Sequence, residues 1–149
     1  MKQVAENEMT LRFPGRSSNE GFARTAVACF AAQLDPTLNE LEDIKTAVSE
    51  AVTNAIVHGY PEHMGDIWLK VRLLSGNVIE ITVRDQGRGI QDVEQARTPM
   101  FTTGGEERSG MGFTIMESFM DKLSVRSRPG QGTIVRMQKK LAPRLRKLP

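Results

Sequence analysis

Two polar residues in one predicted helix have side chains that suit phosphoryl chemistry. Glu50 and Asn54 are four residues apart, so on a helix they lie on one face with Cβ atoms about 5–6 Å apart. A carboxylate can orient or deprotonate an attacking hydroxyl, and an amide oxygen can bind one corner of a Mg²⁺ ion whose other ligands are phosphates and water. Taken alone, the pair is also what a solvent-exposed helix face would show.

A third polar side chain, Asp85, ends a predicted strand and is followed by Gly87 and Gly89. An ionised carboxylate only accepts hydrogen bonds, so it can bind the amino group of adenine, while the two glycines leave room for a purine beside the main chain. As a bare turn signal the pattern is weak. It is also not a dinucleotide fingerprint, because the third glycine is missing and no crossover helix begins there.

The segment Ser109-Gly110-Met111-Gly112 precedes an apolar run that predicts a helix. The unpaired amides at a helix N-terminus favour phosphate, and Arg108 adds a positive charge beside them. An ordinary loop and helix cap is the alternative interpretation. The sequence Gly-x-x-x-x-Gly-Lys-Ser/Thr does not occur, which excludes a P-loop. Together, the three fragments predict an ATP site with bound Mg²⁺.

Composition limits the class of protein that can carry this site. The chain has 149 residues, 39% of them hydrophobic and 26% charged, with a net charge of +2. We expect one domain over residues 1–149, with a short basic tail at about 140–149 that is frayed rather than a binding arm. The balanced charge argues against a nucleic-acid binder. No apolar run approaches the roughly 20 residues that span a bilayer, so we expect a cytoplasmic protein, with Cys29 filling the core.

The elements that must position these residues alternate between strand and helix patterns. The first long helix is predicted over 21–34 after a capping box of Ser17 and Glu20, and the second begins at Asp35-Pro36 and ends at Gly59. Strands are predicted at 8–13, 67–74, 78–84, 123–128 and 133–138, and a short helix at 113–120. These elements predict an α/β fold, a two-layer sandwich with a mixed, mostly antiparallel sheet and helices on one face.

Periodicity also predicts which side of each long helix is buried. The predicted buried positions are Phe22, Ala26, Val27, Phe30 and Leu34 in the first helix and Leu41, Ile44, Val48, Val52, Ala55 and Ile56 in the second.

From about Asn7 to Lys139 the chain resembles the GHKL superfamily, the ATP-binding fold of type II topoisomerases, a heat-shock chaperone, mismatch-repair proteins and histidine kinases. The three fragments match its N, G1 and G2 boxes. Within it, the chain is most similar to the small anti-sigma-factor serine kinases, of the anti-sigma-F type found in endospore-forming bacteria. The supporting segments are residues 49–59, 101–103 and 108–116.

This resemblance implies two activities. The protein would bind and inhibit a sporulation sigma factor, and it would use ATP to phosphorylate a serine of an anti-anti-sigma partner. It would be a homodimer that pairs through its sheets and contacts neither nucleic acid nor membrane directly. Arg24, on the first helix, is the residue we expect both partners to touch.

The resemblance also implies roles for single residues. Glu50 would be the general base, Asn54 the Mg²⁺ ligand and Asp85 the adenine-binding carboxylate. Thr133 would lie near the base. The remaining nucleotide-binding residues would be Gly87 and Gly89 at the pocket floor and Arg108, Ser109, Gly110, Met111 and Gly112 at the phosphates.

The lid departs from the family pattern. Relatives commonly carry a lysine-proline pair after Phe-Thr-Thr, whereas here Gly104-Gly105 leads into Glu106-Glu107. We therefore expect a looser lid, which changes the rate of closure over nucleotide without changing the chemistry.

Three alternatives remain open at the level of sequence. A stress-response anti-sigma kinase would share the chemistry and differ in its partner. A binding regulator could use ATP as a ligand without transferring phosphate. A detached histidine-kinase or topoisomerase ATPase domain is disfavoured, because the chain shows no dimerising phosphoacceptor helix or transducer segment.

Overall fold

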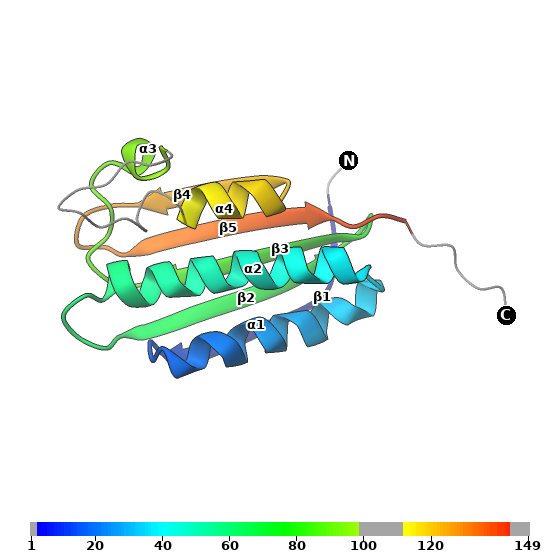
Figure 1. Cartoon of the computed structure of the whole chain (residues 1–149), viewed down its shortest axis with the longest axis horizontal. Coiled ribbons are helices and arrows are strands. Elements are labelled where there is room, and N and C mark those ends of the chain that lie inside the picture. The colour runs from blue at the N-terminus through cyan, green and yellow to red at the C-terminus, as the bar shows by residue number, and fades with distance from the viewer. Residues whose placement is uncertain (1–2, 99–111, 144–149) are drawn as a thin grey trace, which may run out of the picture.

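The computed structural model describes residues 3–98 and 112–143 (Figure 1). Its helical and extended elements alternate along the chain, as the sequence predicts. They are β1 (Ala5–Pro14), α1 (Ser18–Ala31) with a 3₁₀ turn (Ala32–Leu34), α2 (Leu38–Asn54) with a π-helical turn η2 (Ala55–Gly59), β2 (Asp66–Leu74), β3 (Val78–Asp85), α3 (Val93–Ala96), α4 (Gly112–Phe119), β4 (Lys122–Ser127) and β5 (Thr133–Lys140).

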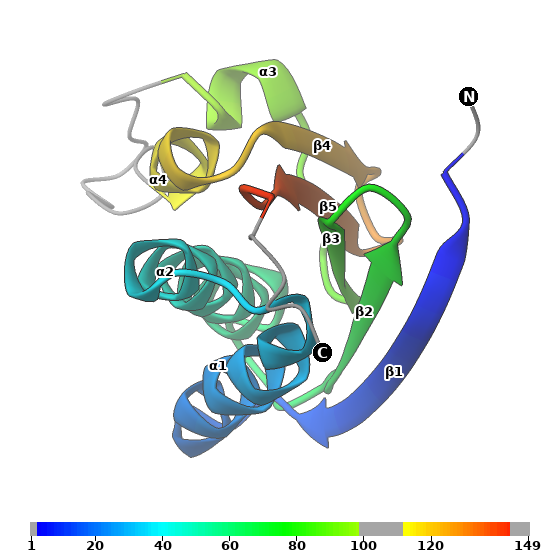
Figure 2. The same cartoon turned by 90° about the vertical axis from the view of Figure 1, so that its right-hand side faces the viewer.

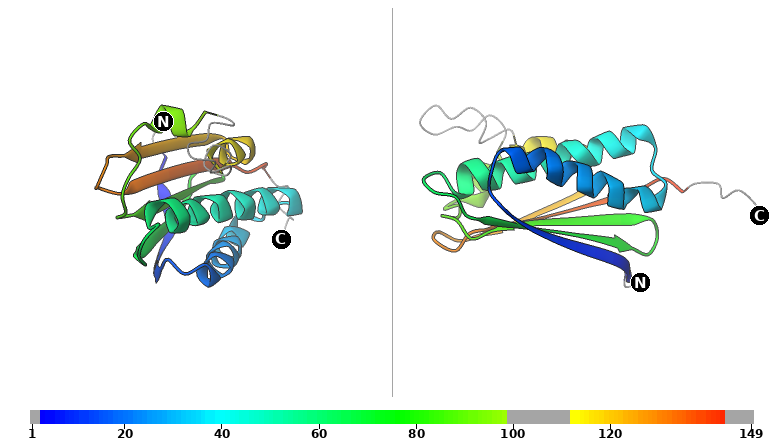
Figure 3. Two further views of the ribbon diagram at one scale, coloured as in Figure 1. Left: turned by 60° about the vertical axis from the view of Figure 1, so that its left-hand side comes forward. Right: turned by 90° about the horizontal axis from the view of Figure 1, so that it is seen from below.

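The five strands form one sheet in the order β1-β2-β3-β5-β4. Helices α1, α2 and α4 cover one face of it (Figure 2), which is also visible when the molecule is seen from below (Figure 3). This confirms the two-layer α/β sandwich. All four pairings among the described strands are antiparallel, so we find no parallel pair of the kind that a mixed sheet would contain.

The core lies between the sheet and α2. Alternate residues of β3 face the helices, and Ile79, Ile81 and Val83 are buried there. On α2 and the first residue of η2 the predicted stripe is confirmed for the four residues that are buried: Ile44, Val48, Val52 and Ala55. Burial of this apolar surface, at about 25 cal/mol per Å², fixes the face that α2 turns toward the site.

Helix α1 presents a different side to the core than we predicted. Its buried residues are Ala23, Val27 and Ala31, which include small side chains that let α1 approach α2 closely. Phe22 is 57% exposed, so its predicted burial is wrong. Cys29 is also exposed and does not fill the core.

Both predicted helix starts need correction. Ser17 makes no side-chain cap; Glu20 instead accepts hydrogen bonds from Ser49 and Arg24. Helix α2 begins after Asp35-Pro36, because Asp35 adopts a left-handed conformation with φ 55°. Thr37 is the N-cap of α2 and forms a reciprocal capping box with Glu40.

The outer face of the sheet, opposite the helices, carries a buried polar cluster. Glu80 is 7% exposed and accepts hydrogen bonds from Arg72 Nε at 2.9 Å and Gln138 Nε2 at 2.7 Å. In residues 3–98 and 112–143, none of the helices has both the length and the apolar character needed to cross a membrane.

Candidate functional site

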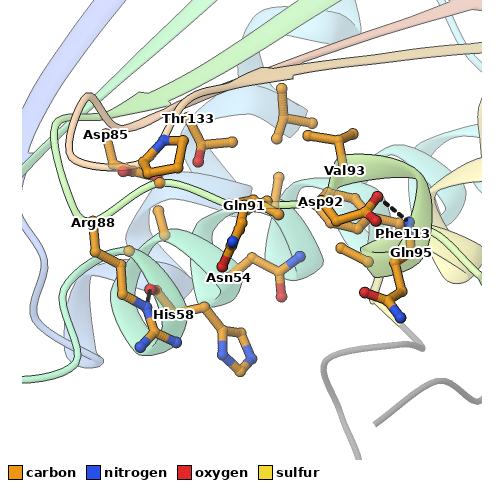
Figure 4. Close-up of a pocket in the computed structure, with 18 of the residues that line it drawn as sticks. Asn54, His58, Asp85, Arg88, Gln91, Asp92, Val93, Gln95, Phe113 and Thr133 are labelled. Carbon is orange, nitrogen blue, oxygen red and sulfur yellow. Dashed lines mark hydrogen bonds between the residues drawn. The ribbon is translucent and has the colours of Figure 1, made fainter. Parts of the chain in front are cut away.

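A pocket of about 1100 Å³ opens on the helix-covered side of the sheet, large enough for a cofactor-sized ligand. It lies where β3 ends and β5 begins, beside the end of α2. Asp85 and Thr133 lie at one end of it, Phe113 and Gln95 at the other, and Asn54 between them (Figure 4). Other residues lining the pocket are His58, Arg88, Gly89, Ile90, Gln91, Asp92 and Val93.

Asn54 is the last residue of α2, and a π-helical turn follows it directly. The amide of Tyr60 donates to the carbonyl of Ala55 at 3.2 Å, which is the i to i+5 spacing of a π-helix. Such turns interrupt α-helices often at functional sites. Here the extra residue ends the regular helix at the point where Asn54 faces the pocket.

The first residue of α4 lies against Asn54. A Cβ placed on Gly112 would come within 2.9 Å of Asn54 Nδ2 and 3.0 Å of Oδ1, so any larger residue would require the Asn54 amide to move. The structure thereby brings together the predicted Mg²⁺ ligand and the start of the predicted phosphate-binding helix. We find them in contact, although 58 positions separate them in the sequence numbering.

Asp85 is 6% exposed at the base of the pocket. Its Oδ1 accepts a hydrogen bond from the amide of Gly87 at 2.9 Å. Burial raises the pKa of Asp85 above its ordinary value, while hydrogen bonds from the backbone of Gly87 and Thr133 act in the opposite direction. A carboxylate has about four acceptor positions, so the bonds from Gly87 and Thr133 leave room for a hydrogen bond from a ligand.

Two glycines hold the turn after β3 in place. A Cβ on Gly87 would overlap the carbonyl oxygen of Gly59, and the amide of Arg88 donates to that same oxygen at 3.0 Å. Gly89 has φ 76° and packs on the carbonyl of Arg128. Gly89 lines the pocket, whereas Gly87, predicted at the pocket floor, is not among the residues that line it. Both glycines allow close backbone packing, and the space for a purine stays a prediction.

Tyr60 is a positioning residue that sequence analysis missed. Its hydroxyl donates to the carbonyl of Asp66 at 2.6 Å and accepts from the amide of Gln86 at 2.7 Å. These bonds tie the end of η2 to β2 and to the turn after Asp85. A single tyrosine directly after the segment 49–59 gives no local signal of this role, because both partners are main-chain groups brought close by the fold.

His58 and Arg88 also escaped the sequence analysis. Both line the pocket, and Arg88 Nε donates to the carbonyl of His58 at 3.0 Å (Figure 4). His58 lies one turn beyond Asn54, and that spacing was the available signal.

The other predicted residues have mixed placements. Thr133 is buried and lines the pocket, whereas Glu50, one turn before Asn54 on α2, is partly exposed and is not part of the pocket wall. Arg24 forms an ion pair with Glu20 at 2.9 Å and borders a separate surface hollow with Ser49. The predicted residues Arg108, Ser109, Gly110 and Met111 lie outside the described residues, as does the predicted lid.

The pocket fits an adenine nucleotide on chemical grounds. A buried acceptor, Asp85, matches an exocyclic amine, and one amide oxygen, Asn54, suits a Mg²⁺ ion that takes its other ligands from phosphates and water. The described residues contain no group of three histidine, cysteine or acidic side chains that could hold a metal by themselves.

Comparisons with known proteins agree with this geometry. The family described as "Histidine kinase-like ATPase domain" matches residues 13–139. An anti-sigma F factor of Thermoanaerobacter sp. (strain X514) is 60% identical over 134 residues, covering 89% of this chain and 93% of that protein. The anti-sigma F factor of Bacillus subtilis (strain 168) is 57% identical over 139 residues, covering 92% and 94% of the two chains.

Solved structures share the fold at low sequence identity. A crystal structure of RsbU and RsbW domains from Mycobacterium tuberculosis has a TM-score of 0.67 at 19% identity, covering 91% of this chain and 32% of that one. A histidine kinase domain from Erythrobacter litoralis has a TM-score of 0.57 at 23% identity, covering 82% and 61%. Both support the arrangement of sheet and helices described above.

Proposed function

Because the chain belongs to the histidine kinase-like ATPase family and, within it, to the anti-sigma F factors, we propose that it is an ATP-dependent serine kinase as well as an anti-sigma factor. As an anti-sigma factor it binds and inhibits a sporulation sigma factor. As a kinase it transfers phosphate to a serine of an anti-anti-sigma partner. The observation that carries the nucleotide site is the buried Asp85 carboxylate facing a pocket that also contains Asn54 and the start of α4.

The protein's part in catalysis is mainly positioning. Asp85 would bind the adenine amino group, and Asn54 would provide one oxygen ligand to a Mg²⁺ ion. Bound ATP supplies the phosphoryl group, and Mg²⁺ neutralises charge on its phosphates. With the base at Asp85, the phosphates would extend toward Asn54 and the start of α4.

Glu50 is the general base in this proposal. It lies one helical turn from Asn54 on α2 and is partly exposed, so an incoming serine hydroxyl can reach it from solvent. Its carboxylate would accept the serine proton as the serine oxygen bonds to the terminal phosphorus of ATP and the bond from that phosphorus to the oxygen of the leaving ADP breaks. Because Glu50 does not line the pocket, it would act on the protein substrate and not on the nucleotide.

Partner contacts are proposed for two surfaces. Arg24 is held by Glu20, which also accepts from Ser49, the neighbour of Glu50. A partner that touches Arg24 would therefore lie close to the proposed base. The outer face of the sheet, which no helix of the described residues covers, is the surface we propose for pairing into a homodimer (Figure 2).

Phosphate transfer is the direct test. The purified protein is incubated with radiolabelled ATP, Mg²⁺ and a candidate anti-anti-sigma protein, and label on the partner is identified by phosphoamino-acid analysis. We expect phosphoserine on the partner and none when Mg²⁺ is chelated. A second variant, Arg24→Ala, tests the proposed partner contact, and it should reduce transfer and leave ATP binding intact. Phosphothreonine, or label that stays on this chain, would contradict serine transfer to a partner.

A second candidate is an ATP-gated binding regulator without transferase activity. The observation that favours it is that Glu50 does not line the pocket in the described part of the chain. Tight ATP binding together with ATP-dependent sigma-factor capture, but no transfer to any tested partner, would support it. Pull-downs with sporulation and stress-response sigma factors would separate the sporulation anti-sigma factor from a stress-response kinase.

A further inference from the structure

A serine outside the predicted motifs lies directly behind the base-binding end of the pocket. Ser127 is the last residue of β4, and its Oγ has three hydrogen-bond partners. It accepts from the amide of Ile90 at 2.7 Å, donates to the carbonyl of Gly132 at 2.8 Å and contacts Thr133 Oγ1 at 2.8 Å. Ile90 and Thr133 both line the pocket, whereas Ser127 does not.

The hydroxyl groups of Ser127 and Thr133 are in contact, and the number of protons they carry determines which of them donates. A carbonyl oxygen cannot donate, so the one proton of Ser127 serves Gly132. A hydroxyl has one proton and two lone pairs, and one lone pair of Ser127 receives the Ile90 amide. The contact between Ser127 and Thr133 is then a hydrogen bond only if Thr133 donates. The proton of Thr133 is thereby directed away from the pocket.

The consequence is a second acceptor beside Asp85. The two residues face each other across β3 and β5, where Asp85 pairs with Thr133. Thr133 is 8% exposed, and Figure 4 shows it at the same end of the pocket as Asp85. Because the Thr133 proton is bonded to Ser127, the Thr133 hydroxyl can only accept hydrogen bonds from a ligand at this end of the pocket. The ionised carboxylate of Asp85 is likewise only an acceptor.

We propose that Ser127 is a positioning residue that makes Thr133 an acceptor-only group and so sets the preference of the pocket for a purine with an amino group at C6. This inference rests on the proposed nucleotide site and adds a determinant of base selectivity to it. An amino group brings two N–H donors to two acceptors. A base without that group leaves both acceptors unpaired, which is costly in a buried site.

The test compares the affinities for ATP and for purine riboside triphosphate, which lacks only the C6 amino group. Both are titrated by calorimetry with Mg²⁺ present, and the ratio of the two affinities is recorded. In Ser127→Ala the Thr133 hydroxyl is free to rotate. We expect the ratio to fall by about 3–10-fold, the range that one net hydrogen bond provides. Ser127→Thr, which keeps the hydroxyl, should restore the wild-type ratio.

Two controls separate this role from a structural one. Ser124→Ala changes a serine of the same strand that is exposed, and it should leave the ratio unchanged. In a Thr133→Val background, Ser127→Ala should no longer alter the ratio, because Ser127 acts through the Thr133 hydroxyl. If Ser127→Ala does not fold, Ser127→Cys can replace it. A thiol fills the same space but is a weak donor and acceptor, so the affinity ratio should fall here too.

The outcomes are distinguishable. Failure of the wild-type protein to bind ATP would overturn the proposed function and this inference together. Normal preference for ATP in the wild type, with an unchanged ratio in folded Ser127→Ala, would overturn the role of Ser127 alone. A change in ratio that persists in the Thr133→Val background would also overturn it.

Discussion

Strand β3 carries two buried carboxylates that face opposite sides of the sheet, and their surroundings differ. Glu80, on the outer face, is paired with Arg72 and Gln138 across the neighbouring strands. Asp85, on the helix side, accepts from main-chain amides and faces a pocket. The two residues are buried to nearly the same extent, since Glu80 is 7% exposed and Asp85 is 6% exposed. Both carboxylates accept hydrogen bonds from the protein, but Glu80 is ion-paired with Arg72, whereas Asp85 has main-chain partners and borders the pocket proposed for nucleotide. The kind of partner and the adjoining pocket, and not the extent of burial, therefore distinguish the two.

A third carboxylate extends this comparison and should give the largest effect. Glu50 is partly exposed on α2 and is the proposed base. Replacing it with alanine should lower phosphate transfer by about 10²–10⁴-fold and leave ATP binding unchanged, because it acts on the serine proton and not on the nucleotide. Single-turnover transfer and calorimetry measure the two quantities. Equal transfer rates in Glu50→Ala and the wild type would sink the assignment.

The next largest effect is expected at Asp85. Asp85→Asn replaces an acceptor-only group by an amide that also donates, so ATP affinity should fall by about 10–100-fold, which is the range for a hydrogen bond to a charged group. Preference for adenine over other bases should relax. Thermal stability should not decrease, because the ionised carboxylate is disfavoured by burial. Calorimetric titration and thermal unfolding test both statements, and unchanged ATP affinity would contradict the role of Asp85.

Glu80 should show the opposite pattern. Glu80→Gln leaves Arg72 with a neutral partner, and we expect a loss of about 1–2 kcal/mol in the free energy of unfolding. The loss should stay in this range because solvent partly screens the Arg72 side chain. ATP affinity should remain at the wild-type value. Denaturant unfolding and the same titration measure these effects. A stable Glu80→Gln variant with weakened ATP binding would reverse the comparison.

The smallest effect is a dependence on pH. The pKa of Asp85 in the folded protein lies above its ordinary value of 3.8, so acidification protonates it sooner than an exposed aspartate. ATP affinity should decline as the pH falls through the folded-state pKa, while the contribution of Asp85 to folding stability rises over the same interval. Titrations at several pH values should show this decline in the wild type. An identical profile in Asp85→Asn would assign it to another group.

Local patterns predicted much of the fold. The alternation in β3 and the hairpin around Gly76 (residues 75–77) depend on neighbouring residues, and both are as expected. The start of α2 was not predictable in the same way. Asp35 resembled an N-cap in the sequence, but it adopts a left-handed conformation before the helix, and Thr37 is the N-cap instead. The predicted burial of Phe22 failed because the contact between α1 and the core is made by small residues on an adjacent side of the helix.

The site was predicted where its chemistry lies within a motif. Asp85 and Asn54 stand in recognisable segments, and the structure brings both to one pocket. Tyr60 and Ser127 were missed because their partners are far away in the sequence or are main-chain groups. Glu80 was missed for a related reason, since its partners Arg72 and Gln138 belong to two other strands. Such hydrogen bonds exist only once the sheet has formed.

The most direct test of the nucleotide site is a crystal structure of the protein with a non-hydrolysable ATP analogue and Mg²⁺. We expect the adenine amino group within about 3.2 Å of a carboxylate oxygen of Asp85 and the metal on the side-chain oxygen of Asn54. A nucleotide bound with its base away from Asp85, or with the metal held by other side chains, would contradict it.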